Sequence, residues 1–386
     1  MVRISDILRR GRDEEEPRKD KAQQVQQEKE EKPPLPAQDK PKKEKPPKKA
    51  KRQSRKKTSS EPSAKDSSVE EKEPVASHVE IARVIMEKTR AGRPRSDEIY
   101  QELIALIKTV LDKAAKREPI RGRDILLRID RAVDQMALAA DELMALVSNS
   151  TPDNYLYAHS VNVSLLSIRL GLGLGYNKSR LSELGLAGFL CDIGMVKVLD
   201  ITRQPRKLTP DEYEKVKEHP VYGTEILEKI KDLSKVVIYV THQEHERING
   251  SGYPRGLTMG DIDENARIVG LLDVYEALTH PRPHRKRLLP YEAIQEMIRN
   301  RDQFDHDLLK ALIEEIGIYP IGSWVELNTG ETAIVTSLNK GFPLQPTVNV
   351  IADSEGHKLK EAKSVELPAQ AAIFIKRPLS ESEPSK

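Results

Sequence analysis

Three successive stretches between residues 79 and 147 carry aliphatic residues at intervals of three and four positions, and this spacing most constrains the fold. It gives each stretch one apolar face and one charged face, which is typical of helices that pack against one another. Breaks rich in glycine, proline and arginine separate the stretches, which cover residues 79–88, 99–116 and 125–147. We therefore expect a compact helical module over residues 79–150. A packing or dimerisation role suits its apolar faces, so a homodimer is one expected assembly.

A second set of helical stretches, between residues 155 and 316, differs because residues that can bind metal recur inside apolar helices. Each of them alone is more often a capped or hydrogen-bonded core residue than a metal ligand. Their order along the chain and their sequence context favour a shared site instead. These residues are His159, Cys191, Asp192, His219, His242, His245 and Asp273.

Short motifs in the same region are more specific than the single residues. The run HERINGSGYPRGL covers residues 245–257, with DIG and HPVYG before it and ARIVGLLDVYEALT and RPHRK after it. In this order the motifs resemble the HD-GYP family of cyclic di-GMP phosphodiesterases, over residues 155–316. The resemblance implies an all-helical HD-superfamily bundle with two or three iron, manganese or similar ions at its centre, which binds and hydrolyses cyclic di-GMP.

Divalent metal ions suit this reaction. Attack on a phosphodiester needs a water made nucleophilic near neutral pH, and paired cations achieve this while they stabilise charge on the phosphoryl oxygens. Nitrogen and oxygen ligands favour iron or manganese, and a thiolate ligand would add zinc to the candidates. We expect two divalent ions, whereas the sequence leaves the product open between linear pGpG and GMP.

The resemblance assigns five residues to the ligand positions of the family. They are His159, Asp192, His219, His245 and Asp273. Cys191 and Glu244 stand where the family has imidazoles, so the expected set of metal ligands includes these two as well. Met195 stands where the family has a lysine that assists at the phosphate, and the expected catalytic positions are Asp192 and Met195.

The replaced positions leave alternatives open. A Cys191 thiolate could bind metal, but a cysteine at the end of an apolar helix also behaves as a small hydrophobe. A nucleophilic cysteine is disfavoured, because no paired base is evident. Met195 offers neither a charge nor a proton. Lys197 could take the place of the family lysine if the segment were extended, since side chains two positions apart in a strand point to the same side. Glu244 is a milder change, because carboxylates bind iron, manganese or magnesium, and His242 is expected to face the same centre.

A glycine-rich turn follows the last histidine of the set. Its glycines and proline impose a turn that other residues would not make. The resemblance assigns this loop to the ligand pocket and to contacts with diguanylate cyclase (GGDEF-type) partners, and the residues concerned are Gly252, Tyr253 and Pro254. Arg282 and Arg285 are expected to bind phosphate.

The segments at either end differ from this region in composition. Residues 1–78 lack aromatic residues and are rich in Lys, Glu, Gln, Pro and Ser, which predicts a disordered tail. Its basic block, residues 40–57, favours a solvated tether, and the alternative is contact with nucleic acid, anionic lipid or an acidic protein through nonspecific charge. Within residues 1–10, apolar side chains indicate a short helix that docks elsewhere, and they are Val2, Ile4, Ile7 and Leu8. Residues 319–378 alternate across NTG and DSEG turns, which predicts a small β-sheet or barrel domain, followed by a disordered tail over residues 379–386.

These observations combine into one expected architecture and two functional hypotheses. The architecture is mainly α, with an HD-GYP domain over residues 151–318 between the helical module and the β domain. A single cysteine excludes an internal disulfide, and no stretch is apolar enough to cross a membrane, so we expect a cytoplasmic protein. The first hypothesis is a metal-dependent cyclic di-GMP phosphodiesterase. The second is an inactive module that binds cyclic di-GMP or scaffolds partners, because fold membership does not settle activity.

Overall fold

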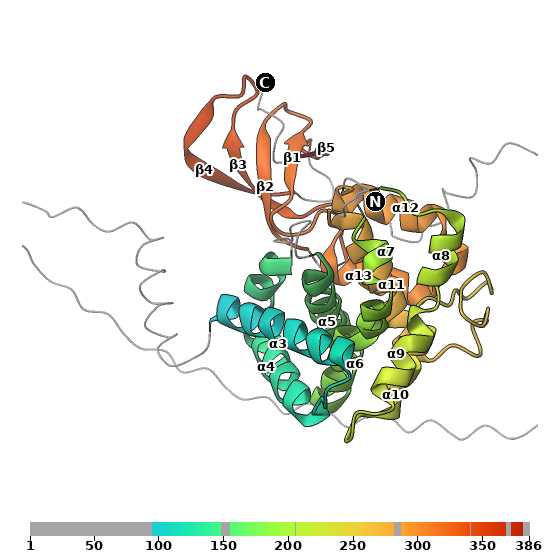
Figure 1. Ribbon diagram of the computed structural model, residues 1–386. Coiled ribbons are helices and arrows are strands. Elements are labelled where there is room, and N and C mark those ends of the chain that lie inside the picture. The colour runs from blue at the N-terminus through green and yellow to red at the C-terminus, as the bar shows by residue number, and fades with distance from the viewer. Residues whose placement is uncertain are drawn as a thin grey trace, which may run out of the picture. The chain divides into compact units, whose positions relative to one another are not determined.

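The computed structural model describes residues 95–147, 155–204, 206–281, 287–339, 341–367 and 372–380 (Figure 1). All of these residues belong to one unit of the chain. The predicted tail over residues 1–78, the stretch 79–88, and both Arg282 and Arg285 lie outside the described residues. The same holds for residues 381–386 of the predicted C-terminal tail.

Most of the described chain is helical, and the mainly α fold class is confirmed. The helices before the sheet, in chain order, are α3 (Ser96–Lys116), α4 (Gly122–Val147), α5 (Tyr155–Gly173), α6 (Lys178–Leu190), η2 (Cys191–Lys197), α7 (Leu199–Thr202), α8 (Pro210–Val216), α9 (His219–Leu227), α10 (Lys235–Gln243), α11 (Glu264–Thr279), α12 (Pro290–Arg299), η3 (Arg301–Gln303) and α13 (His306–Ile316).

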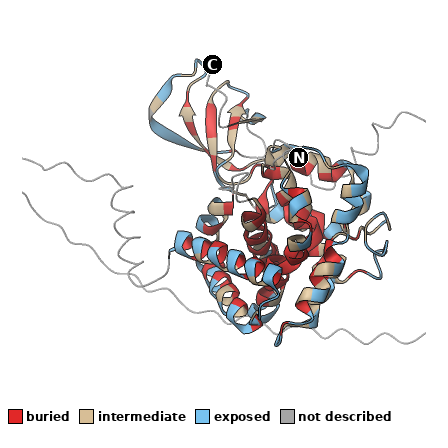
Figure 2. Cartoon of the chain, viewed as in Figure 1, coloured by how far each residue is buried: buried red, intermediate tan, exposed pale blue. Residues whose placement is uncertain are grey.

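Helices α3 and α4 each bury one face, as their periodicity predicts (Figure 2). Ile99, Leu103 and Ile107 of α3 are at most 2% exposed, and burial of each such side chain contributes about 1.5–3 kcal/mol. Both helices pack against α5. The predicted module therefore shares its core with the helices that follow, and its boundary at residue 150 stays a prediction.

Helices α5 and α6 lie close together because small residues line their contact. The Ser164 hydroxyl on α5 donates to the Gly185 carbonyl oxygen on α6 over 2.7 Å. A Cβ atom on Gly185 would lie 2.7 Å from the Ile168 side chain, so a larger residue there would push the helices apart. This approach places the end of α6, with Cys191 and Asp192, beside the first turns of α5.

The C-terminal part is an antiparallel sheet of five strands in the order β4-β3-β2-β1-β5. The predicted NTG and DSEG turns join β1 to β2 and β3 to β4. Alternate side chains point into the sheet's core, and Val325, Val335 and Val348 are at most 1% exposed. The strands are β1 (Trp324–Leu327), β2 (Thr332–Ser337), β3 (Thr347–Ala352), β4 (Lys358–Glu366) and β5 (Ile375–Leu379).

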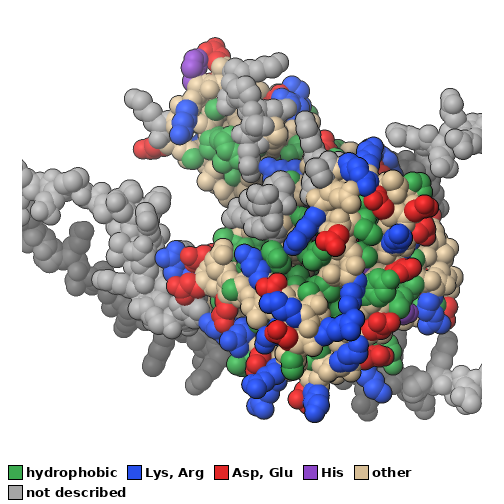
Figure 3. All heavy atoms as spheres, in the orientation of Figure 1, with side chains coloured by type: hydrophobic (Ala, Val, Ile, Leu, Met, Phe, Trp, Pro, Cys, Tyr) green, Lys and Arg blue, Asp and Glu red, His purple; other side chains and the backbone are tan. Residues whose placement is uncertain are grey.

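The outer surface of the helices is charged in both signs. On the face shown in Figure 3, basic and acidic side chains are interspersed. Ion pairs such as Arg131 with Glu102, 2.6 Å apart, join neighbouring helices. Among the described residues, no helix is both long enough and apolar enough to cross a membrane.

Candidate metal centre

Five segments bring polar side chains to one buried point of the helical part. His159 lies in the second turn of α5, and Asp192 lies in η2 directly after α6. His219 opens α9, while Glu244 and His245 follow the end of α10 and Asp273 lies in the middle of α11. Each of these residues except His245 is less than 10% exposed, and the residues are separated by up to 114 positions in the chain.

Four of these residues form a group with the geometry of a metal site. One ligand atom from each of Asp192, His219, Glu244 and His245 can be chosen so that all four atoms lie within 4.8 Å of one another. The His219 Nε2 atom lies 3.3 Å from Asp192 Oδ1 and 2.9 Å from His245 Nε2. Burial and the neighbouring His219 lower the pKa of His245 to about 3. His245 is therefore a neutral imidazole, the form that binds metal.

A second set of contacts adjoins the first through Asp192. The His159 Nε2 atom lies 3.2 Å from Asp192 Oδ2 and 3.1 Å from Asp273 Oδ1. Asp273 also approaches His245, with Oδ2 3.6 Å from Nδ1. Burial opposes ionisation of Asp273, but its contact with the His159 ring lowers its pKa to about 2. The two oxygens of Asp192 thus face two different groups of ligands.

Two of the imidazole rings are oriented by hydrogen bonds from Nδ1, the ring nitrogen that faces away from the centre. His219 donates from Nδ1 to the Val216 carbonyl oxygen over 2.7 Å, and His159 donates from Nδ1 to Glu276. Glu276 in turn accepts from the Asn162 side chain over 2.9 Å. Because a carbonyl and a carboxylate oxygen accept from Nδ1, Nε2 is the nitrogen that each ring directs at the centre, as in known metal sites.

The arrangement contains buried polar atoms that a cation would satisfy. Glu244 is 1% exposed, and neither of its carboxylate oxygens has a hydrogen-bond partner among the described residues. The nearest imidazole nitrogens, on His219 and His245, lie 3.9 and 4.0 Å from Oε1, beyond hydrogen-bond reach. Burial and the charges of Asp192 and Asp273 raise the pKa of Glu244 well above its ordinary value. A buried carboxylate is costly unless a charge pairs with it, so these residues fit divalent metal.

The GYP turn lies against this group. A Cβ atom on Gly252 would lie 2.4 Å from the Arg247 nitrogen and 2.5 Å from the His245 carbonyl oxygen, so only glycine fits there. The Tyr253 ring stacks on the His245 ring, with centroids 4.8 Å apart and planes 22° apart. The Lys217 ammonium lies 5.8 Å from the centre of the Tyr253 ring. An aromatic ring and a cation therefore border the ligand group.

The sequence analysis did not identify the residue that anchors this turn. Glu246 is 5% exposed, and its carboxylate accepts from the backbone nitrogens of Arg255 and Leu257 over 2.7 and 2.8 Å. An acidic residue beside a ligand pair and before a glycine-rich turn is the sequence signal for such an anchor. The orienting carbonyl of Val216 leaves no such signal, because any residue type supplies a carbonyl.

Comparisons with known proteins agree with this geometry. A family described as "HD domain" matches residues 135–308, and one described as "KOW domain associated with HD domain" matches residues 324–386. The chain is 39% identical over 209 residues to "Cyclic di-GMP phosphodiesterase PA4108" of Pseudomonas aeruginosa, with 54% of this chain and 50% of that protein covered. Residues 135–308 of this chain belong to the HD domain family. The first family match covers the ligand group and the second covers the sheet.

Two further relatives are more distant from this chain. "Cyclic di-GMP phosphodiesterase PdeB" of Borreliella burgdorferi is 29% identical, over 60% of this chain and 61% of that protein. "3'3'-cGAMP-specific phosphodiesterase 1" of Vibrio cholerae is 34% identical, over 39% of this chain and 36% of that protein. The chain spans about half the length of the first relative and less than two thirds of the other two.

Cys191 departs from the HD-GYP pattern and takes no part in the four-residue group. The side chain is fully buried, and Sγ donates to the Gly188 carbonyl oxygen over 3.3 Å. Burial and the charge of Glu244 raise the pKa of the Cys191 thiol well above its ordinary value. These contacts are those of a packed thiol, and a ligand role for Cys191 stays a prediction.

Lys197 does not replace the HD-GYP lysine in the way that the sequence suggested. Residues Cys191–Lys197 form a 3₁₀ helix and not an extended segment, so side chains two positions apart point in different directions. Met195 is half-buried and Lys197 is exposed to solvent. His242 also lies outside the four-residue group, where its Nδ1 atom is 3.3 Å from the Thr224 hydroxyl.

Proposed function

We propose that this chain hydrolyses a phosphodiester bond of cyclic di-GMP with two divalent ions, iron or manganese. The single observation that carries the proposal is the buried Glu244 carboxylate, which lacks a hydrogen-bond partner among the described residues and faces imidazole nitrogens. One ion would be held by Asp192, His219, Glu244 and His245. The other would be held by His159, Asp192 and Asp273. The names of two relatives support the substrate.

Bound divalent ions supply a water that is nucleophilic near neutral pH and stabilise charge on the phosphoryl oxygens. The residues of this chain prepare the site for that chemistry. The Val216 carbonyl and the Glu276 carboxylate hold the protons on Nδ1 of His219 and His159, which keeps both Nε2 atoms directed at the centre. Asp192 links the two ligand groups, so its loss should disable both.

The substrate's phosphate needs a cation from the protein, because Met195 carries no charge. Lys217 is the residue that we assign to this role, since its ammonium lies near Tyr253, whose ring stacks on His245. Burial raises the pKa of Tyr253, so its hydroxyl stays protonated and can donate to a phosphate oxygen. Arg282 and Arg285 remain proposed phosphate contacts from the sequence.

The exposed side of the GYP turn is the proposed contact for a GGDEF-type partner. Pro254 and Arg255 are exposed, whereas Tyr253 points at the ligand group. A partner could therefore bind the turn from outside while substrate contacts it from inside. A homodimer is likewise a proposal from the sequence.

Turnover by the full chain tests the proposal. Protein purified without oxygen and supplied with ferrous iron or manganese is incubated with cyclic di-GMP and, separately, with 3'3'-cGAMP. We expect hydrolysis that Asp192→Ala abolishes and that Asp200→Ala preserves, because Asp200 is exposed and lies eight positions away. Preferential turnover of 3'3'-cGAMP would correct the substrate.

Binding without turnover would instead support the second hypothesis. If the wild-type chain binds cyclic di-GMP with a dissociation constant of about 1 μM or less, yet neither metal supports hydrolysis, the chain is a binding module. Met195 in place of the lysine is then the first residue to examine. A Met195→Lys variant that gains turnover would identify the missing group.

A further inference from the structure

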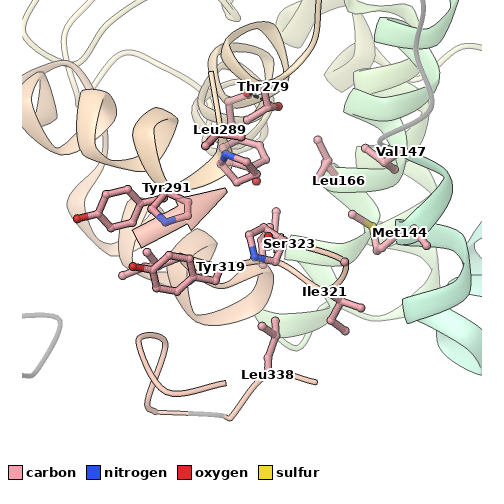
Figure 4. A pocket seen from close by; sticks show the side chains of 18 of the residues that line it. Met144, Val147, Leu166, Thr279, Leu289, Tyr291, Tyr319, Ile321, Ser323 and Leu338 are labelled. Carbon is pink, nitrogen blue, oxygen red and sulfur yellow. Dashed lines mark hydrogen bonds between the residues drawn. The ribbon is translucent and has the colours of Figure 1, made fainter. Parts of the chain in front are cut away.

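A cavity of about 340 Å³ lies between the helices and the sheet, away from the ligand group (Figure 4). None of the proposed metal ligands lines it. Met144, Leu166 and Tyr319 contribute from helices α4 and α5 and from the segment after α13. Trp324 and Leu338 contribute from the start of β1 and the segment after β2.

The walls of this cavity are suited to an apolar occupant. Figure 4 shows aliphatic and aromatic side chains around the space, and the Tyr291 and Tyr319 rings on one side are stacked 5.3 Å apart. The volume is in the range of pockets that bind small molecules or a few side chains, about 300–1,000 Å³. Water in an apolar pocket is readily displaced by aliphatic groups, because their transfer out of solvent is favourable.

The start of the described chain contacts α4, the helix that supplies one wall of the cavity. Helix α3 begins at Ser96, and the Ser96 hydroxyl donates to Glu142 on α4 over 3.3 Å. Asp141, the neighbour of Glu142, lines the cavity. The described chain therefore begins beside α4, which presents the consecutive carboxylates Asp141 and Glu142.

The sequence of residues 1–10, MVRISDILRR, is complementary to the apolar walls of the cavity and to the acidic residues of α4 beside it. Ile4, Ile7 and Leu8 are spaced to form one apolar face of a helix. Arg9 and Arg10 follow directly, with charge opposite to that of these acidic residues. Amphipathic helices bind apolar grooves through such i, i+3 and i+4 anchors.

We propose that residues 1–10 dock in this cavity of the same chain, with the apolar face inside and the arginines at Asp141 and Glu142. The linker of residues 11–94 has a root-mean-square span of roughly 50 Å if it is flexible, so reach does not limit docking. Such a linker gives an effective concentration on the order of 1 mM. Exposed ion pairs contribute at most about 1 kcal/mol each, so the apolar face carries the binding.

Hydrogen exchange on the full chain tests the docking. The triple variant Ile4→Asp, Ile7→Asp, Leu8→Asp removes the apolar face. A matched control, Ala22→Asp, Val25→Asp, Gln26→Asp, places the same three charges at the same spacing elsewhere in the tail. We expect backbone amides in residues 287–291 and 316–324 to exchange at least about tenfold faster in the first variant and unchanged in the control.

A labelled peptide of residues 1–10 gives an independent measurement. It should bind the triple variant and bind the wild-type chain at least about tenfold more weakly, because the tethered segment competes. Adding Leu338→Glu to the triple variant should abolish peptide binding by placing a charge in the cavity wall. Peptide binding that Leu338→Glu leaves unchanged would overturn the proposal.

If something other than residues 1–10 of the same chain occupies the cavity, the pattern of hydrogen exchange should differ. Equal exchange in all three proteins means that residues 1–10 do not occupy the cavity. Protection that falls on dilution of the wild-type chain assigns the segment to a second copy, which overturns docking within one chain. Protection that survives the aspartate substitutions and is lost after extensive dialysis assigns the cavity to a small molecule.

Discussion

The Glu244→Gln variant is expected to stabilise the metal-free protein and to weaken metal binding at the same time. In the metal-free site the Glu244 carboxyl is buried beside Asp192 and Asp273, and its pKa is raised well above the ordinary value of 4.5. Below pH 4.5 this carboxyl is protonated in both the folded and the unfolded state, so it does not lower the free energy of unfolding. As the pH rises from 4.5 toward the folded-state pKa, ionisation in the unfolded state alone lowers the free energy of unfolding. Glutamine has nearly the same shape and does not titrate.

The size of this effect has an upper limit set by pH. At pH 7 the unfolded chain carries an ionised Glu244, and the gap between 4.5 and pH 7 corresponds to at most about 3 kcal/mol in the free energy of unfolding. At pH 5 the corresponding limit is about 0.7 kcal/mol. With roughly 2–4 °C per kcal/mol for a domain of this size, the Tm should rise by several degrees at pH 7 and by at most about 3 °C at pH 5.

Metal should reverse the order of stability. A ligand that binds the folded state raises the Tm of the wild-type chain by an amount that grows with the logarithm of its affinity. Loss of the Glu244 charge should lower that affinity by more than about 300-fold, because a carboxylate ligand is exchanged for a neutral amide, and such a loss offsets the gain of about 3 kcal/mol at pH 7. The wild-type chain is then the more stable protein in saturating manganese, whereas Glu244→Gln is the more stable one after chelation.

Thermal unfolding at pH 5, 6, 7 and 8, with chelator and with manganese, measures both effects. Glu228→Gln is the matched control, because Glu228 is exposed. Its Tm should follow the wild-type value under every condition. The reasoning fails if metal-free Glu244→Gln is no more stable than the wild-type chain at pH 7, or if the difference between them does not depend on pH.

Four further substitutions separate the roles of individual residues. Glu276→Gln should lower metal affinity about 10- to 100-fold, measured by calorimetry, because His159 loses the partner of its Nδ1 proton. Gly252→Ala should lower kcat/KM at least about tenfold with unchanged metal content, since the added Cβ would meet backbone atoms; altered metal content would contradict this. Lys217→Ala should lower kcat/KM about tenfold, whereas Lys215→Ala should not. Cys191→Ala should leave metal content, measured by elemental analysis, unchanged, and a loss would make Cys191 a ligand.

The sequence predicted the architecture where the pattern depends on local spacing. Apolar residues at helical intervals specified α3 and α4, and alternation across two turns specified the hairpins of the sheet. The candidate ligands were found through motif order, because no spacing rule links His159 to Asp273 across such a length of chain. Their convergence is a property of tertiary packing, which the α5–α6 contact through Gly185 illustrates.

Other features depend on conformation that these patterns do not encode. Whether Lys197 shares a side with Met195 depended on the backbone of residues 191–197, which is a 3₁₀ helix. The proton position on His219 depends on a carbonyl oxygen of Val216. Whether Cys191 is a metal ligand or a packed core residue depends on the direction of its thiol. That direction is set by the backbone at the junction of α6 and η2.

The replacements at Cys191 and Glu244 act on each other and are best understood together. The charge of Glu244 is, after burial, the main cause that raises the pKa of the Cys191 thiol. A neutral thiol is a poor ligand for zinc, which binds the thiolate. The same Glu244 adds a third carboxylate to Asp192 and Asp273, and oxygen ligands favour manganese or ferrous iron. An imidazole exchanged for cysteine alone would make the centre softer, whereas the accompanying carboxylate offers the centre a hard oxygen ligand.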